Sequence, residues 1–151
     1  MTRLIIAVVS LGCLPQVHAQ KGTVPCAMSV EYGSKNQVKP RALAVRTVSG
    51  EVIAEVGSPA KSLGSFPACL GLFTQPDYCL IASVAADETG RFSFNSVRPG
   101  RYRLVARDPQ GAFCVANTEV HVVRRARKSK AILIHLRPAG IDDCSYAELR
   151  P

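Results

Sequence analysis

Residues 87–107 constrain the fold more than any other segment, because they alternate polar and apolar side chains between closely spaced turn signals. In Arg91-Phe92-Ser93-Phe94 the two aromatic rings share one face of an extended chain. In the run that follows, one face carries Tyr102, Leu104 and Ala106, and the other carries Arg101, Arg103, Val105 and Arg107. A period of two residues predicts two half-buried β-strands whose aromatic and aliphatic side chains turn into a core.

Turns are predicted at three places in and after this segment. Asp87-Glu88-Thr89-Gly90 and Asp108-Pro109-Gln110-Gly111 have the composition of tight turns. Arg98-Pro99-Gly100-Arg101 is predicted to form a type II turn, since proline presets the first central residue and glycine takes the positive φ of the second. A β-branched residue in place of Gly100 would then cost about 1 kcal/mol or more.

The rest of the chain shows the same pattern of short apolar runs between turn signals, without a sustained helical period. Strands are predicted at 41–48, 51–56, 80–86, 113–123 and 131–136, and Ser49-Gly50 is predicted to be the turn of a hairpin. Residues 57–79 are predicted to be a long cysteine-bearing loop, because they contain three prolines and several glycines. The fold class expected is all-β, a small antiparallel β-sandwich of about seven strands. Its predicted core consists of Leu43, Val45, Phe92, Phe94, Tyr102, Leu104, Val120, Val122, Ile132 and Ile134.

The first 19 residues have the layout of a secretory signal peptide. Arg3 supplies a positive charge, residues 4–14 are mostly apolar, and small residues precede a cleavage site after Ala19. The alternative, a lipoprotein modified at Cys13, is disfavoured because Ser10 occupies a position where such signals carry an aliphatic residue. We therefore expect a secreted or periplasmic protein without a membrane span.

The domain organisation expected is a signal peptide at 1–19, an N-terminal extension at 20–39, one β-sandwich at 40–137 and a C-terminal tail at 138–151. After cleavage five cysteines remain, which allow two disulfides and one free thiol in an oxidising compartment. The preferred pairs are Cys69 with Cys79 and Cys26 with Cys144. Cys114, inside a strand pattern, is then the free thiol.

The residues around 87–104 resemble the carboxypeptidase regulatory-like domain. The pattern is an aspartate, a turn glycine, alternating phenylalanines, then Pro99-Gly100, Tyr102 and an aliphatic strand. The resemblance covers roughly residues 40–136 and implies a transthyretin-like or prealbumin-like sandwich, grouped with starch-binding-like domains. Such modules usually accompany exported peptidases, receptors or surface proteins as non-catalytic parts. The pattern marks core and turns, so it transfers no functional residue to this chain.

A strong positive charge points to anionic partners. The sequence has 19 basic and 11 acidic residues, and net charge +8. A basic patch is predicted from the outward face of one strand and from the turn that follows residue 123. Its residues are Arg101, Arg103, Arg107, Arg124, Arg125, Arg127 and Lys128. The alternative is a solvated turn whose charges prevent pairing between sheet edges.

No residue pattern indicates catalysis, a cofactor or a metal. A zinc site of Glu119, His121 and His135 would have only three ligands with loose spacing. The function expected is a non-catalytic module that binds a protein or an anionic envelope polymer, and not nucleic acid. A first alternative is a carbohydrate-binding module that stacks Phe73 and Tyr78 on sugar rings. A second is an inhibitor-like protein that presents the loop between Cys69 and Cys79.

Overall fold

The computed structural model describes Cys26, Met28 and residues 42–57, 59–124, 130–138 and 145–150. All regular structure in this part of the chain is β-strand, as predicted, but there are ten strands instead of seven. None of the described residues belongs to a helix of the length and apolarity that a membrane span requires. The strands are β1 (Leu43–Val45), β2 (Val48–Val56), β3 (Lys61–Ser65), β4 (Cys69–Thr74), β5 (Leu80–Ala85), β6 (Arg91–Phe94), β7 (Gly100–Arg107), β8 (Ala116–Val122), β9 (Ile132–Leu136) and β10 (Tyr146–Leu149).

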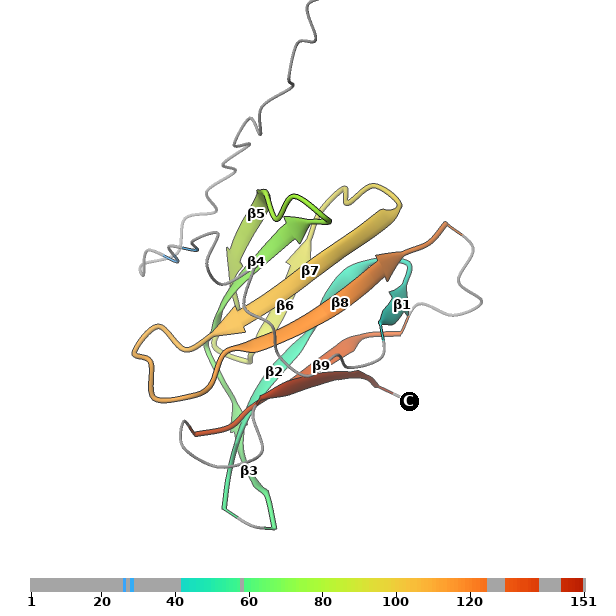
Figure 1. The fold of residues 1–151 in the computed structure, drawn as a ribbon. Coiled ribbons are helices and arrows are strands. Elements are labelled where there is room, and N and C mark those ends of the chain that lie inside the picture. The colour runs from blue at the N-terminus through green and yellow to red at the C-terminus, as the bar shows by residue number, and fades with distance from the viewer. Residues whose placement is uncertain are drawn as a thin grey trace, which may run out of the picture.

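The strands form two sheets that pack face to face (Figure 1). Sheet A has the order β1-β8-β7-β4-β5, and sheet B has the order β10-β9-β2-β3, with β6 also paired to β2. The sheets are mixed, since β1 runs parallel to β8 and β2 runs parallel to β9. The predicted all-β sandwich is confirmed, and the two parallel pairs are the departure from the antiparallel arrangement that was expected.

The predicted core is confirmed. All ten residues expected there are buried between the sheets, and six further aliphatic side chains from β2, β4, β9 and β10 join them. The largest fully buried ones include Leu70 and Leu72 of β4 and Leu136 of β9. The alternation along β6 and β7 thus identifies the inward face correctly, since Phe92, Phe94, Tyr102, Leu104 and Ala106 all lie there.

Ser49-Gly50 is not a turn, so the predicted hairpin is wrong. Both residues lie within β2, which continues to Val56. Gly50 is paired with Ile132 of β9, and a Cβ atom at Gly50 would lie 1.8 Å from the Ile132 carbonyl oxygen. The glycine is therefore needed for the close approach of two central strands.

Residues 57–79 are also not the loop that was predicted. They contain β3 and β4, and β4 lies inside sheet A between β5 and β7. Five of the six β4 residues are buried, so the strand has a continuous apolar sequence with no alternation to identify it. Likewise, the tail at 138–151 contains β10, which forms an edge of sheet B.

Two of the three predicted turns are confirmed. Gly90 has φ 71° and its N–H donates to the Asp87 carbonyl at 2.9 Å, and Gly111 has φ 77° in the equivalent place after Asp108. The type II turn at Gly100 is wrong. Gly100 is the first residue of β7 without a positive φ, and the left-handed residue of this connection is Ser96, with φ 57°.

Candidate functional site

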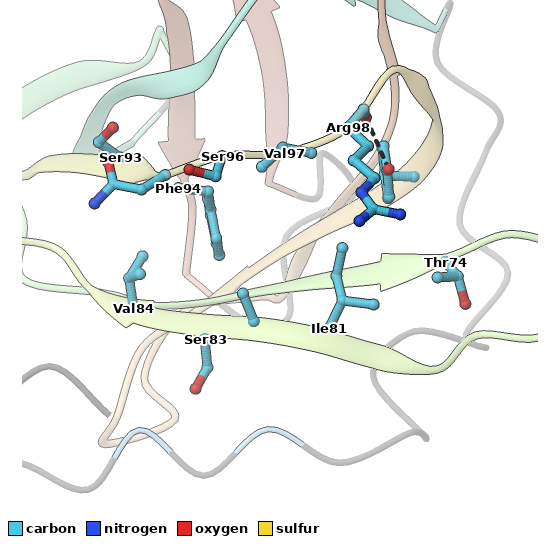
Figure 2. Close-up of a pocket in the computed structure, with 12 residues that line it drawn as sticks. Thr74, Ile81, Ser83, Val84, Ser93, Phe94, Ser96, Val97 and Arg98 are labelled. Atoms are coloured by element: carbon cyan, nitrogen blue, oxygen red, sulfur yellow. Dashed lines mark hydrogen bonds between the residues drawn. The ribbon is translucent and has the colours of Figure 1, made fainter. Parts of the chain in front are cut away.

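The open edge of the sandwich contains a groove between β5 of sheet A and the connection from β6 to β7. A cavity of about 570 Å³ lies there. Figure 2 shows Ile81 and Val84 of β5 pointing toward Phe94 and Val97 on the opposite side. The groove is lined by Thr74, Ile81, Ala82, Ser83, Val84, Ser93, Phe94, Asn95, Ser96, Val97, Arg98 and Tyr102.

The chemistry of this groove is apolar and neutral except at one point. Among the described residues that line it, Arg98 alone carries a charge, and Figure 2 shows its side chain reaching toward β5. The buried Tyr102 hydroxyl donates to the Arg98 carbonyl at 2.8 Å and so fixes this part of the connection. Burial raises the pKa of Tyr102, so the phenol remains a neutral donor.

A second hollow, of about 1070 Å³, lies beside the β5–β6 and β7–β8 turns. The rings of Phe66 and Phe113 meet edge to face there, with centroids 5.0 Å apart. The Asp87 and Asp108 carboxylates lie at its rim, but both accept hydrogen bonds from backbone N–H groups of their own turns. Hydrogen bonds from the Thr89 hydroxyl and from the backbone N–H groups of Arg91 and Thr89 lower the pKa of Asp87. The two aspartates therefore have a structural role in the turns.

A polar cluster on the outer face of sheet B was not found from the sequence. His135 of β9 is 6% exposed and Glu55 of β2 is 9% exposed. His135 Nδ1 lies 2.6 Å from Glu55 Oε1, and Nε2 lies 3.3 Å from Glu148 Oε1. The Arg137 Nε–H donates to the second Glu55 oxygen at 3.2 Å. Tyr146 of β10 stacks on the His135 ring, with centroids 4.3 Å apart.

Two opposing effects set the pKa of the Glu55 carboxyl. Burial raises the pKa, and the hydrogen bonds and charges of His135 and Arg137 lower it. The second effect is larger, so the pKa lies below its ordinary value and Glu55 is ionised at neutral pH. The cluster joins β2, β9 and β10, and its charged groups are satisfied by one another.

The predicted basic patch is divided by the structure. Arg101 and Arg124 are exposed at one end of sheet A. Arg107 lies at the opposite end of β7, about 20 Å from Arg101, because each residue of a strand advances the chain by about 3.3 Å. The Arg103 guanidinium lies over the Tyr78 ring, 4.9 Å from its centroid. Arg125, Arg127 and Lys128 lie outside the described residues.

Phe73 and Tyr78 do not form the sugar platform that was considered. Phe73 is fully buried on the outer face of sheet A, so no ligand can stack on it, and this part of the prediction is wrong. Tyr78 is half-buried under Arg103. Val105, on the outward face of β7, is also fully buried.

Cys26 and Met28 contact this outer face of sheet A. Cys26 is disulfide-bonded to Cys69 of β4, across a sequence separation of 43. Two residues later, Met28 lies over Gly71, where a Cβ atom would be 2.8 Å from the methionine methyl carbon. Gly71 is paired with Val105, so Met28 lies on the face of sheet A where Val105 is buried.

The cysteine pairing predicted from the sequence is wrong. Because Cys69 bonds Cys26, neither the Cys69–Cys79 pair nor the Cys26–Cys144 pair exists. Cys79 is disulfide-bonded as well, and Cys144 lies outside the described residues. Cys114 is free, as predicted, although it is half-buried and lies before β8. Without a Cys69–Cys79 loop, the inhibitor-like alternative loses its basis.

The three residues considered as zinc ligands are divided between the two sheets. Glu119 and His121 belong to β8 in sheet A, and His135 belongs to β9 in sheet B. Within the described ranges, no group of three or more histidine, cysteine, aspartate or glutamate residues is placed to hold a metal ion. β8 pairs with β1 and β7, whereas β9 pairs with β2 and β10.

Comparison with known proteins identifies one family. The family model described as BOS complex subunit NOMO1-like, second beta sandwich domain, matches residues 47–135. The match covers more than half of the chain and includes β2 to β9, and with them the groove. It supports a β-sandwich of the transthyretin-like kind, although the carboxypeptidase regulatory-like domain itself is not matched. Neither curated proteins nor solved structures gave a match.

Proposed function

Because the chain belongs to the family of the second β-sandwich domain of NOMO1-like BOS complex subunits, we propose that it is a non-catalytic module that binds another protein outside the cytosol. The family match is the observation that carries the proposal, since the matched description names a subunit of a complex. The groove beside β5 is the surface that we assign to the partner, because it combines apolar side chains with a single charge.

The proposal includes export. Residues 1–19 act as a signal peptide that is cleaved after Ala19, and the sandwich from β1 to β10 is the binding part of the mature chain. The disulfide between Cys26 and Cys69 supports this placement, because disulfides persist mainly in oxidising compartments. Cleavage would be tested by N-terminal sequencing of the protein recovered from its native host. An N-terminus at Gln20 is expected, and a retained Met1 would contradict the proposal.

Binding would be tested by affinity capture with the mature chain in the envelope or secreted fraction of its host. A protein partner should be retained at constant stoichiometry, and a Val84→Lys variant, with a charge placed in the groove, should lose most of it. Arg91→Gln is the matched control, because Arg91 is exposed on β6 and does not line the groove. Equal recovery by the wild type and Val84→Lys would remove the groove from the proposal. The absence of any retained protein would contradict the proposed function.

A second candidate is binding to an anionic envelope polymer. It is favoured by the exposure of Arg101 and Arg124 at one end of sheet A, next to the basic residues Arg125, Arg127 and Lys128 in sequence. Co-sedimentation with isolated envelope across a salt series would test it. Retention that falls with salt, and falls further in Arg124→Ala, is expected. Retention that does not change with salt or with the substitution would exclude this candidate.

A further inference from the structure

The free edges of the two sheets differ in how well they are protected against pairing with another chain. An edge strand presents unpaired backbone N–H and C=O groups, and native proteins blunt such edges with short length, charges, proline or irregular backbone. The β1 edge has three residues. The β3 edge has Lys61 and a glycine with φ 100°, β6 begins with Arg91, and β10 contains Glu148.

The β5 edge is the exception among the described edge strands. Its six residues, Leu-Ile-Ala-Ser-Val-Ala, include no charge, no proline and no glycine. A bulge lies near Ile81, and from Ala82 to Ala85 the strand pairs regularly with β4. No described strand pairs with the opposite side of β5, so every second residue from Ala82 to Ala85 directs its backbone N–H and C=O groups to the open edge.

The groove lies directly beside this edge. Ala82 and Val84 line it, and Phe94 of β6 closes it from the other sheet. A strand added to β5 would place alternate side chains over this apolar surface, because successive residues of a strand point to opposite faces. The space of about 570 Å³ lies within the range of ligand pockets, so it can take more than one small apolar side chain of an added strand.

The charge of Arg98 favours some extended partner segments over others. Arg98 reaches toward β5 near Ile81, and no carboxylate is among the described residues that line the groove. A guanidinium favours a carboxylate, to which it donates two parallel hydrogen bonds. The Arg98 carbonyl is held by the Tyr102 hydroxyl, so the position of this residue is fixed by the core.

We infer that β5 binds its partner by strand addition, and that the partner is an extended protein segment with small apolar residues at alternate positions and a carboxylate that meets Arg98. The inference rests on the proposed function and specifies how the groove takes its protein partner. Main-chain hydrogen bonds to β5 supply affinity, and the groove and Arg98 supply selection.

Two synthetic peptides would test the inference with the intact mature chain. One alternates threonine and valine over six residues and ends in aspartate, and the other is identical but ends in lysine amide. The aspartate peptide should bind, and Arg98→Gln should weaken it about tenfold while leaving the lysine peptide unchanged. The control Arg91→Gln should not change the binding of either peptide. An equal effect of Arg98→Gln on both peptides would overturn the assignment of the carboxylate.

Amide hydrogen exchange of the wild-type protein provides a readout that does not depend on a variant. The bound peptide should slow exchange within Ala82–Ala85, and slowing elsewhere without change in β5 would overturn strand addition. A concentration-dependent dimer that is abolished by Val84→Lys would instead assign the edge to a second copy and also overturn the inference. If the Val84→Lys variant still captured a native partner, the proposed function would be retained and binding by strand addition to β5 would be refuted. If the wild-type protein neither captured a native partner nor bound the aspartate peptide, both the proposed function and strand addition would be refuted.

Discussion

Glu55→Gln keeps the shape of the side chain and removes its charge, so it measures what the charge contributes to the cluster on sheet B. In the native protein the carboxylate accepts hydrogen bonds from His135 and Arg137. A hydrogen bond to a charged group contributes about 1.5–3 kcal/mol and a neutral one about 0.5–1.5 kcal/mol. Each of the two bonds should weaken by about 1–1.5 kcal/mol, so the free energy of unfolding at pH 7 should fall by about 2–3 kcal/mol.

Urea unfolding followed by circular dichroism would measure this change. With a denaturant dependence of about 1.5 kcal/mol per molar, the midpoint should fall by about 1.3–2 M. Glu51→Gln is the matched control on the same strand, because Glu51 pairs at 2.9 Å with the largely exposed Arg150. An exposed pair contributes about 0–1 kcal/mol, so this variant should remain within 1 kcal/mol of the wild type.

The pH dependence tests the physical cause. The pKa of Glu55 is lower in the folded protein than its ordinary value, so its contribution is present above about pH 4.5 and disappears as the pH falls through the folded-state pKa. The difference between the wild type and Glu55→Gln should therefore narrow in acid. A difference below 0.5 kcal/mol at pH 7, on the order of the error of extrapolated free energies, would refute the reasoning, as would a difference that does not narrow toward pH 3.

Two further predictions concern the backbone and the disulfide. Gly90→Ala should lower the melting temperature more than Gly111→Ala. Both glycines have positive φ, but a Cβ atom at Gly90 would lie 2.3 Å from the Val52 carbonyl oxygen, whereas one at Gly111 would meet nothing within 4 Å. Equal melting temperatures of the two variants would contradict this prediction. Cys26→Ser should lower the free energy of unfolding by about 3–4 kcal/mol for a closed loop of this length. A peptide map without reduction should join Cys26 to Cys69, and a Cys69–Cys79 peptide would contradict the structure.

The sequence identified the inward face of the sandwich because burial on one side of a strand leaves a period of two. Phe92, Phe94, Tyr102 and Leu104 follow this period, and all four are buried. β4 does not follow it, since both of its faces are covered, and its cysteine and central glycine looked like part of a loop. Gly50 was misread for a related reason, because its close contact with β9 is non-local and glycine in a sequence is equally typical of a turn.

The candidate sites depend on contacts that sequence patterns do not contain. Glu55 and His135 are 80 residues apart and meet because β2 pairs in parallel with β9, and the strands predicted from the sequence did not include this pairing. One signal was present, since Glu55 is a charge within the apolar run of β2. The groove arises where two sheets end beside each other, so it could be found only once β5 and β6 were placed at the same open edge.

The parallel pairing of β2 with β9 also governs when the chain can fold. β2 ends at Val56, but its parallel partner β9 begins at Ile132. β1 can likewise pair only after β8 has been synthesised. A chain that leaves the ribosome N-terminus first therefore carries an unpaired β1 and an incompletely paired β2 until most of its length has emerged. Contacts between distant segments slow folding and prolong the exposure of strand edges. The sandwich should thus remain open during most of its synthesis, in the state that a chaperone binds and an unfolded-chain translocation machinery accepts.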